Sequence, residues 1–540
     1  MNVTEEKDVL ENVADGLTVK DVMPKREKLW FFYPGLLKLN IFLLIGILCQ
    51  VVSGYDGSMM NGIQALESWQ NYFDHPAGGR LGTMVNGNTI GTLITVPFVT
   101  FMCDYLGRRL SIIIGCCVII IGATLQGAAQ NFSMFMGSRI LLGIGGCIAS
   151  AAAGPYVTEC AYPTHRAQAT AMMLASWPLG SFVAALVTWA AYYSNLQTST
   201  WSWRVPSILQ GFFPLIQLAL ALIAPESPRW LIAKGKVEKA RNFFVKYHAE
   251  GEPDQLIVKM QMAEIMATIE EEKTQHMSNV IKWIKSPGLR HRLFICFFVP
   301  AMLQLEGNAL ISYYLHIILN NIGITDSLTQ LKFNIGLTVW ALVASVVIAS
   351  VVDRFNRRTV FMSGLSSMCF CYVIWTILSA INQQRNFEDK GLAAGVVTMI
   401  YLYNGCNVIC AVIGTPYVME ICPYFMRATG SMIYQLSGNV VGLFNNYVNP
   451  IAMEAITWKY YIVWCCNLVF LMVIVYFFFP ETRGHDLEDV AEVFGSDVVG
   501  GRAAVRKQMM DGEKHFDNNM HLETAAAVEQ TPTDALTEKA

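Results

Sequence analysis

The stretch DYLGRR at residues 104–109 recurs in degenerate form as DRFNRR at residues 353–358. A second pair follows in the same order, because YVTECAYPTHR (156–166) is matched by YVMEICPYFMR (417–427). In both members of this second pair, a glutamate is followed seven residues later by an arginine. Matched motifs in the same order in both halves of the chain predict an internal two-fold repeat.

The composition places this repeat in a membrane. Of the 540 residues, 54% are hydrophobic and only 15% are charged, which is too apolar for a water-soluble protein of this length. About 20 apolar residues cross the hydrocarbon core of a bilayer. The first apolar segment follows a polar stretch and has no small-residue cleavage site after it, so we expect it to be retained and not removed as a signal peptide. We predict twelve spans, at residues 37–57, 82–102, 110–130, 135–157, 168–190, 205–224, 292–316, 333–352, 359–380, 392–416, 429–452 and 460–479.

The repeated motifs fall after the second, fourth and sixth span of each half. The third pair consists of PESPRW (225–230), after span six, and PETRG (480–484), after span twelve. Six-plus-six repeats related by an axis along the membrane normal are typical of secondary transporters that rock between two states. We therefore expect an all-α membrane protein, with twelve transmembrane helices in two six-helix bundles related by pseudo-two-fold symmetry. The expected organisation is an N-terminal tail (1–36), a first bundle (37–224), a linker loop (225–290), a second bundle (291–480) and a C-terminal tail (481–540).

Lysine and arginine are concentrated in alternate loops. They crowd the 225–290 segment and the short loops that carry Arg108 and Arg357, whereas residues 191–203 contain none. The positive-inside rule then predicts that the basic loops, the linker and both termini lie in the cytoplasm. The net charge of −3 says little about partners, but the absence of a basic patch interleaved with aromatic residues argues against a nucleic-acid partner.

Two charged residues lie inside otherwise apolar spans. Asp56 closes the run LKLNIFLLIGILCQVVSGYD, and Arg139 opens RILLGIGGCIASAAAGPYV. A charge at membrane depth costs about 2.5–3.5 kcal/mol on insertion scales, so such residues are usually paired and functional. We predict a switchable ion pair for proton coupling, in which protonation of Asp56 releases the permanently charged Arg139. The alternative is a fixed pair that only holds two helices together.

The repeated loops carry both signs of charge at spacings that allow pairing between helices. We expect them to form a cytoplasmic gate that closes the inner side while the outer side is open. Ordinary positive-inside topology explains the basic residues but not the acidic ones at fixed positions. Each exposed pair contributes only about 0–1 kcal/mol, so only the whole network can bias two states. The predicted gate residues are Asp104, Arg108, Arg109, Glu159, Arg166, Glu226, Arg229, Asp353, Arg357, Arg358, Glu420, Arg427 and Glu481.

Together these motifs resemble the sugar porter family of the major facilitator superfamily. The pattern R-x-x-x-G-x-G at Arg139, Gly143 and Gly145 joins the repeated loops in that resemblance, which runs from about residue 37 to residue 490. It implies the major facilitator fold and a sugar as substrate. Four stretches are more narrowly similar to the fungal lactose permease and cellodextrin transporter branch: GYDGSMMNGIQALESWQNYF (54–73), WSWRVPSILQ (201–210), VKYHAEGEPD (245–254) and EGNALISYYL (306–315).

The resemblance also implies roles by position. Asp56 is similar to the proton-coupling aspartate of bacterial sugar–proton symporters, where passive glucose facilitators carry a neutral residue. Arg139 matches the arginine of helix 4. In helix 7, Gln304 and Gly307 match the family pattern, but Glu306 stands where serine is usual.

Other positions depart from the family pattern. Asn308 stands one residue before the usual asparagine, as in the lactose-type pattern, and the first helix-7 glutamine is replaced by Leu303. The helix-5 glutamine falls on Leu174, the helix-10 tryptophan on Thr415 and the helix-11 asparagine on Gly438. Several polar contacts to a hexose are therefore absent or displaced, which brings a larger glycoside or a non-sugar substrate into consideration.

A sugar needs neutral amides for its hydroxyls and flat aromatic faces for its C–H surface. For each amide the alternative is a hydrogen bond between helices, worth about 0.6 kcal/mol on average in membranes. For each tyrosine the alternative is packing. The predicted substrate contacts are Gln304, Glu306, Asn308, Tyr313, Tyr314, Trp177, Asn404, Asn407 and Asn439.

Glu306 has three open interpretations. It could be a second proton site, a hydrogen-bonding or charge contact to the substrate, or a neutral bystander at the water-filled mouth of the cavity. The sequence does not choose among them.

We expect a monomeric, multi-pass plasma-membrane carrier that imports a sugar together with a proton. The sugar is expected to be a disaccharide or another glycoside, with a hexose as the smaller option. One alternative is a transporter of a specialised non-sugar metabolite, and another is a nutrient sensor that does not transport. We expect no enzyme activity, cofactor or metal site, because no nucleophile–base pair or metal-ligand spacing occurs and the fourteen cysteines lie mostly inside spans.

Overall fold

The computed structural model describes residues 30–194, 196–253, 255–274, 287–385, 387, 389–422 and 427–482. This part of the chain is helical and contains no strand. Both predicted tails lie outside it almost entirely, as do residues 275–286 of the predicted linker. The elements are η1 (Trp30–Phe32), α2 (Pro34–Gln64), α3 (Glu67–Tyr72), α4 (Gly78–Leu106), α5 (Arg108–Gly127), α6 (Phe132–Cys160), α7 (Arg166–Leu174), α8 (Trp177–Tyr193), α9 (Trp201–Leu209), α10 (Phe212–Ile223), α11 (Pro228–Ala233), α12 (Val237–Tyr247), α13 (Leu256–Thr274), α15 (Pro287–Leu305), α16 (Asn308–Asn320), α17 (Ser327–Val351), η3 (Val352–Arg354), α18 (Arg357–Gln384), α19 (Lys390–Ile421), α20 (Arg427–Ile456), η5 (Thr457–Lys459) and α21 (Tyr460–Phe478).

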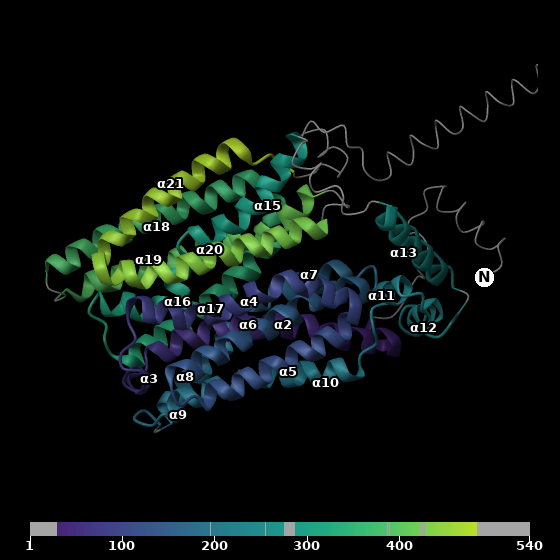
Figure 1. Ribbon diagram of the computed structural model, residues 1–540. Coiled ribbons are helices and arrows are strands. Elements are labelled where there is room, and N and C mark those ends of the chain that lie inside the picture. Colours follow the sequence, from purple (N-terminus) through teal and green to yellow (C-terminus); the bar gives the residue numbers. More distant parts are fainter. Residues whose placement is uncertain are drawn as a thin grey trace, which may run out of the picture.

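Apolar helices long enough to cross a membrane dominate the described residues. There are eleven such continuous helical stretches, and the last of them, Thr429–Phe478, contains both α20 and α21. The two helices are joined by η5, where the chain reverses direction (Figure 1). The prediction of an all-α membrane protein with two helical bundles is therefore confirmed, and the last two predicted spans form one continuous stretch.

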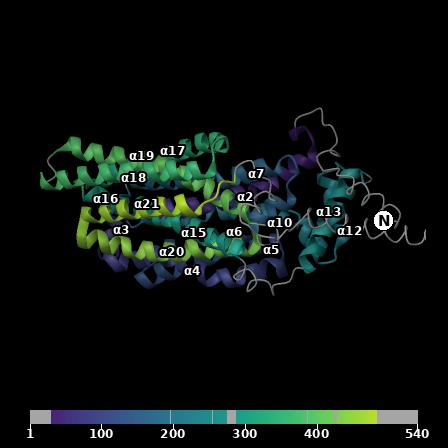
Figure 2. The same ribbon diagram turned by 90° about the horizontal axis from the view of Figure 1, so that it is seen from above.

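Figure 1 shows the two bundles lying one over the other, with α2–α10 in one and α15–α21 in the other. They meet where α4 packs on α20, α8 on α17 and α2 on α16. The short helices α12 and α13 project beyond one end of the first bundle in both views (Figures 1 and 2). That end carries Arg108 and Arg357, and we call it the basic end, which is the predicted cytoplasmic side.

Close helix crossings depend on glycine at particular positions. A Cβ on Gly54 of α2 would overlap the carbonyl of Trp177, and a Cβ on Gly180 of α8 would overlap the carbonyl of Val51. Small residues let transmembrane backbones approach, because lipid supplies little hydrophobic force between helices. This crossing brings the middle of α2 against the start of α8, next to the pocket described below.

The apolar core is divided between the bundles at the basic end and shared at the other end. One cluster lies in the second bundle, and another lies in the first bundle together with α11–α13. A third cluster joins both halves: it packs Met59, Trp69 and Phe135 of the first with Tyr314 and Leu331 of the second. This shared cluster lies at the predicted outer end of the molecule.

The linker helices are tied to the first bundle by hydrogen bonds. The Glu250 carboxylate accepts from the backbone N–H groups of Gly35 (2.9 Å) and Leu36 (3.1 Å), at the start of α2. The first N–H groups of a helix have no partner inside it, and the helix dipole favours a negative charge there. These helices lie in the segment for which the sequence predicted only a loop.

Candidate functional site

The charged residues inside the spans meet in the interior of the first bundle. Asp56 on α2 is 6% exposed and Arg139 on α6 is 1% exposed. Oδ1 of Asp56 accepts from the Arg139 guanidinium, so the two form a buried ion pair. A buried pair of this kind needs further hydrogen bonds to offset the loss of hydration.

Two amides that the sequence analysis did not select supply those bonds. Gln210, at the end of α9, donates through Nε2 to Oδ1 of Asp56 at 2.8 Å. Asn88 on α4 donates through Nδ2 to Oδ2. The Asp56 carboxylate therefore accepts donors from three other helices. The sequence could have indicated both residues, because a polar amide inside an apolar span is uncommon at membrane depth.

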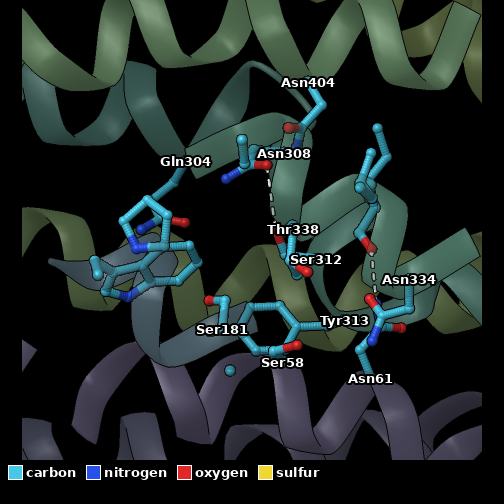
Figure 3. Close-up of a pocket in the computed structure, with 17 residues that line it drawn as sticks. Ser58, Asn61, Ser181, Gln304, Asn308, Ser312, Tyr313, Asn334, Thr338 and Asn404 are labelled. Carbon is cyan, nitrogen blue, oxygen red and sulfur yellow. Dashed lines mark hydrogen bonds between the residues drawn. The ribbon is translucent and has the colours of Figure 1, made fainter. Parts of the chain in front are cut away.

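A pocket of about 280 Å³ lies between the two bundles, beside this ion pair. Gly57 and Ser58, which directly follow Asp56, form part of its wall. In Figure 3, Ser58 and Ser181 lie on one side, and Gln304, Asn308 and Asn404 on the opposite side. The wall contains no charged side chain: its lining residues are Gly57, Ser58, Asn61, Trp177, Pro178, Ser181, Gln304, Asn308, Ala309, Ile311, Ser312, Tyr313, Asn334, Leu337, Thr338, Ala341 and Asn404.

Several polar atoms on the pocket wall have no protein partner. Ser58 Oγ, Asn334 Nδ2 and Asn404 Oδ1 are buried and make no hydrogen bond with any described residue. Buried polar groups are nearly always hydrogen-bonded, so such atoms require a ligand or water as partner. The pocket therefore offers both donors and acceptors, of neutral kind, to its occupant.

Five of the predicted substrate contacts line this pocket: Gln304, Asn308, Tyr313, Trp177 and Asn404. Asn308 is oriented by Ser312, whose hydroxyl donates to its Oδ1 at 3.1 Å. Ser58, Asn61, Ser181, Ser312, Asn334 and Thr338 also line it but were not predicted. They are small polar residues, which occur throughout membrane helices, so only the packing of the helices reveals which of them face the cavity.

At the basic end of the first bundle, the repeated motifs form a compact charge cluster. Arg108 pairs with Asp104 at 3.0 Å and with Glu159 at 3.4 Å. The hydroxyl of Ser227 donates to the same Glu159 carboxylate. The arrangement joins α4, α5, α6 and the segment that follows α10.

Glu226 secures the start of α5 in that cluster. Its Oε1 accepts from the backbone N–H groups of Arg108 (3.0 Å) and Arg109 (3.1 Å). Burial raises the pKa of the Glu226 carboxyl above its usual value, and hydrogen bonds from the backbone of Ser227, Arg109 and Arg108 partly oppose that rise. The Arg109 guanidinium itself donates to the carbonyl of Ala221 at 2.9 Å.

The second bundle repeats the contacts of Glu159 and Glu226 in this cluster. Arg357 pairs with Glu420 at 2.8 Å, and the hydroxyl of Thr482 donates to Glu420 at 2.8 Å. Glu481 accepts from the backbone N–H groups of Arg357 (2.8 Å) and Arg358 (3.1 Å). The predicted two-fold repeat is thus visible in the side-chain contacts, because the acid after proline holds a helix N-terminus in both halves.

Comparison with known proteins identifies the family of this chain. Residues 42–494 match the family described as "Sugar (and other) transporter". The chain belongs to this family. It is a sugar porter of the major facilitator superfamily, a multi-pass integral membrane transporter and not an enzyme.

Fungal transporters are among the relatives of this transporter, and a bacterial transporter is among the similar structures. It is 27% identical to the MFS-type transporter oryC of Aspergillus oryzae, over 82% of this chain and 83% of that protein. It is 24% identical to the low-affinity glucose transporter HXT1 of Saccharomyces cerevisiae, over 96% of this chain and 93% of that protein. The inward open structure of the xylose transporter XylE from E. coli has a TM-score of 0.69 at 19% identity, covering 84% of this chain and 99% of that one. The last likeness shows the shared fold.

Four predicted substrate contacts of the transporter do not line the pocket. Tyr314 is buried, and its hydroxyl donates to the carbonyl of Asn446. Asn439 donates to the carbonyl of Gln435 in its own helix, at 2.7 Å. Helix rotation decides these positions, and the sequence pattern does not reveal it.

The remaining two contact each other instead. Asn407 on α19 donates through Nδ2 to Oε1 of Glu306 at 2.6 Å. Glu306 is 1% exposed, so it lies neither on the pocket wall nor at a water-filled mouth in this conformation.

Not every predicted gate residue joins the charge clusters. Arg166, at the start of α7, is exposed and forms no ion pair with a described residue. Arg229 lies in α11 beside the Glu226 segment. The side chains of Asp353 and Arg427 lie outside the described part of the structure. The ion pairs described at the basic end each stay within one bundle.

Proposed function

We propose that this transporter imports a small neutral sugar together with a proton across the plasma membrane. The observation that carries the proposal is a pocket with a neutral wall and unsatisfied donors and acceptors, directly beside the buried pair of Asp56 and Arg139. A ring of hydroxyls can both accept and donate, so it can satisfy such a wall without bringing charge into the membrane.

The relatives support the choice of a sugar and of a proton. HXT1 is a glucose transporter, and XylE is a proton:xylose symporter. The Asp56 carboxylate fits proton coupling because it accepts hydrogen bonds from three donors when ionised and must rearrange when protonated. Protonation and helix contacts are therefore linked, as proton coupling requires.

The size of the pocket favours a monosaccharide over a disaccharide. Its volume of about 280 Å³ lies just below the usual range for ligand sites, which is about 300–1,000 Å³. A disaccharide or other glycoside, as in the lactose permease and cellodextrin transporter branch, would need the bundles to separate further. The monosaccharide is thus the first candidate and the glycoside the second.

A neutral non-sugar metabolite is the main alternative substrate. Leu174 and Thr415 stand where sugar porters carry glutamine and tryptophan, and the Thr415 hydroxyl donates to Tyr434 at 3.1 Å. The relative oryC is described only as an MFS-type transporter. A sensor without transport is the remaining alternative, and a transport assay alone separates it from both.

Uptake of labelled glucose, xylose, lactose and cellobiose in a transporter-deficient yeast tests the proposal. We expect saturable uptake of at least one monosaccharide, stimulated by an acidic medium and abolished by a protonophore. Competition by neutral polyols but not by sugar phosphates or amino sugars would support the neutral wall. Saturable uptake that ignores the proton gradient would refute coupling, and no sugar uptake from correctly localised protein would refute the substrate class.

A further inference from the structure

The seventh membrane span, called helix 7 in the family pattern and distinct from α7, is interrupted beside the pocket. Side chains hold the interruption in place. It consists of α15, which ends at Leu305, and α16, which begins at Asn308. Gly307 between them has a φ of +99°, a left-handed conformation that favours glycine. An interrupted helix leaves carbonyls without partners inside the helix.

Four consecutive carbonyls at this break each accept from a different helix. The carbonyl of Gln304 accepts from Asn445 on α20 at 2.6 Å, and that of Leu305 accepts from Asn467 on α21. The next two carbonyls, those of Glu306 and Gly307, accept from tyrosine hydroxyls. Tyr403 on α19 donates to Glu306 at 2.9 Å, and Tyr372 on α18 donates to Gly307 at 3.2 Å.

The Glu306 side chain projects from this break into the second bundle. Its Oε1 accepts from Asn407, whereas its Oε2 is buried and has no hydrogen-bond partner among the described residues. The ionisable groups around it are Tyr372 on α18, Tyr403 and Cys410 on α19, and Tyr434 on α20. None of these is a cation, and Glu306 forms no ion pair with a described residue.

The contrast with Asp56 defines the chemistry. Asp56 has a guanidinium and two further donors, an environment suited to a carboxylate. Glu306 has one amide donor, and burying a charge with so little compensation is far more costly than burying a neutral carboxyl. The surroundings of Glu306 therefore fit the protonated acid in this conformation.

We propose that Glu306 is a second proton-binding site, in the second bundle, that is loaded in this conformation and emptied when the helix-7 break rearranges. The inference rests on the proposed proton-coupled function. Gln304 and Asn308 flank the break and line the pocket, so substrate binding and the position of Glu306 are mechanically connected. The carboxylate takes one H⁺ from water on one side and returns it to water on the other, with no other bond changed.

A second proton changes the driving force for transport. When a gradient of one pH unit is the sole driving force, one coupled proton permits about tenfold accumulation of a neutral substrate, and two permit about hundredfold. The number of protons per substrate is therefore measurable as an equilibrium, independent of turnover rate.

The test uses the full-length protein in proteoliposomes, with the substrate found in the uptake panel. The substrate gradient that exactly balances an imposed proton gradient gives the proton-to-substrate ratio. We expect a ratio of two for the wild type and one for Glu306→Gln, which keeps an acceptor for Asn407 but cannot release a proton. Accumulation by the variant at one pH unit should fall about tenfold. Glu454→Gln, on the exposed outer end of α20, is the matched control and should keep the ratio of two.

The outcomes separate this inference from the proposed function. A wild-type ratio of one overturns the second site even if Glu306→Gln fails to fold, and an unchanged ratio of two in a folded variant overturns it as well. A wild-type ratio of zero refutes proton coupling itself, and with it both proposals. A ratio of two that falls to one only in Glu306→Gln supports the second site.

Discussion

The Asp56 carboxylate joins four helices. As a carboxylate it accepts from Arg139 on α6, Asn88 on α4 and Gln210 at the end of α9. A protonated carboxyl gains an O–H donor and loses part of its capacity to accept, so these contacts cannot all persist. The Arg139 guanidinium stays charged at any physiological pH, which makes its pairing the part that must change.

The first prediction concerns this residue. Asp56→Asn should abolish net accumulation but leave exchange of labelled for unlabelled substrate. An amide cannot pair ionically with Arg139 or cycle a proton. The empty carrier needs the ion pair to form again before it can return, so a proton on Glu306 alone cannot drive accumulation. Exchange requires only the loaded carrier. Both are measured in the same proteoliposomes.

Its control is Asp389→Asn, because Asp389 caps the start of α19 at the protein surface and asparagine caps equally well. That variant should accumulate substrate like the wild type. Accumulation against a gradient by the Asp56 variant would exclude this carboxyl as the coupling site.

A second prediction concerns the pocket wall. Gln304→Ala and Asn308→Ala should each weaken apparent affinity about two- to twelvefold, because a lost hydrogen bond costs about 0.5–1.5 kcal/mol. Asn439→Ala is the matched control, since its amide is bonded within its own helix and does not line the pocket. Competition curves at equal surface expression measure the effect. Equal affinities in all three variants would mean that the first two amides do not contact substrate.

For single residues, the sequence predicted the partners of charged side chains better than the partners of amides. Asp56 and Arg139 could be paired in advance, because a charge inside an apolar span has few acceptable environments. Asn88 and Gln210 could not, since a single amide in a membrane helix can bond to its own helix, a neighbour or the cavity. Which of these occurs depends on helix rotation and on a partner in another helix, 32 positions away for Asn88 and 154 for Gln210.

At the scale of the element, the break in helix 7 is the feature that hydropathy misses. The span reads as one apolar segment, and its predicted bounds of 292–316 lie within the observed stretch Gly288–Asn320. Length and composition suffice to find such spans, because every backbone group in lipid must be bonded internally. The break is possible only because side chains from four other helices bond its carbonyls, and no local pattern encodes those partners.

The third prediction tests that break. Gly307→Ala should abolish transport, because alanine is disfavoured at a φ of +99° by about 1–2 kcal/mol and its Cβ would also overlap the Tyr372 hydroxyl. Gly251→Ala is the matched control, with a φ of +101° but no atom within 4 Å of the added Cβ. It incurs the backbone strain without the clash. We expect the control to retain transport, and the two variants are compared by uptake and thermal stability. Full uptake by Gly307→Ala would show that transport does not require this conformation of the break.

At the scale of the whole molecule, several described hydrogen bonds join the two bundles at the predicted outer end. Gln64 on α2 donates to the carbonyl of Tyr313 at 2.9 Å, and Asn86 on α4 donates to that of Leu443 at 3.1 Å. The shared apolar cluster lies at the same end. At the basic end, the described ion pairs remain inside their own bundle. This distribution is what a state closed to the outside requires in a rocking carrier.

The last prediction concerns Asn61 and the equilibrium between the states closed and open to the outside. Its Nδ2 lies 3.3 Å from both the carbonyl of Ile311 and Oδ1 of Asn334, and its Oδ1 accepts from the backbone N–H of Leu315 at 3.2 Å. Asn61→Ala removes all of these bonds between the bundles, so it should shift the population toward the outward-open state. If their net contribution is about 1 kcal/mol each, the ratio of the two states changes by more than tenfold.

The measurement is the labelling of a cysteine placed at Ser181 by a membrane-impermeant thiol reagent added outside. The protein lacking that cysteine is the blank. Asn382→Ala is the matched control, since this buried amide donates to Ile322 within the second bundle and its loss leaves the contact between bundles intact. Faster labelling in Asn61→Ala alone would identify these bonds as an outer lock, whereas equal labelling in both variants would show that the apolar cluster closes the outer end without them.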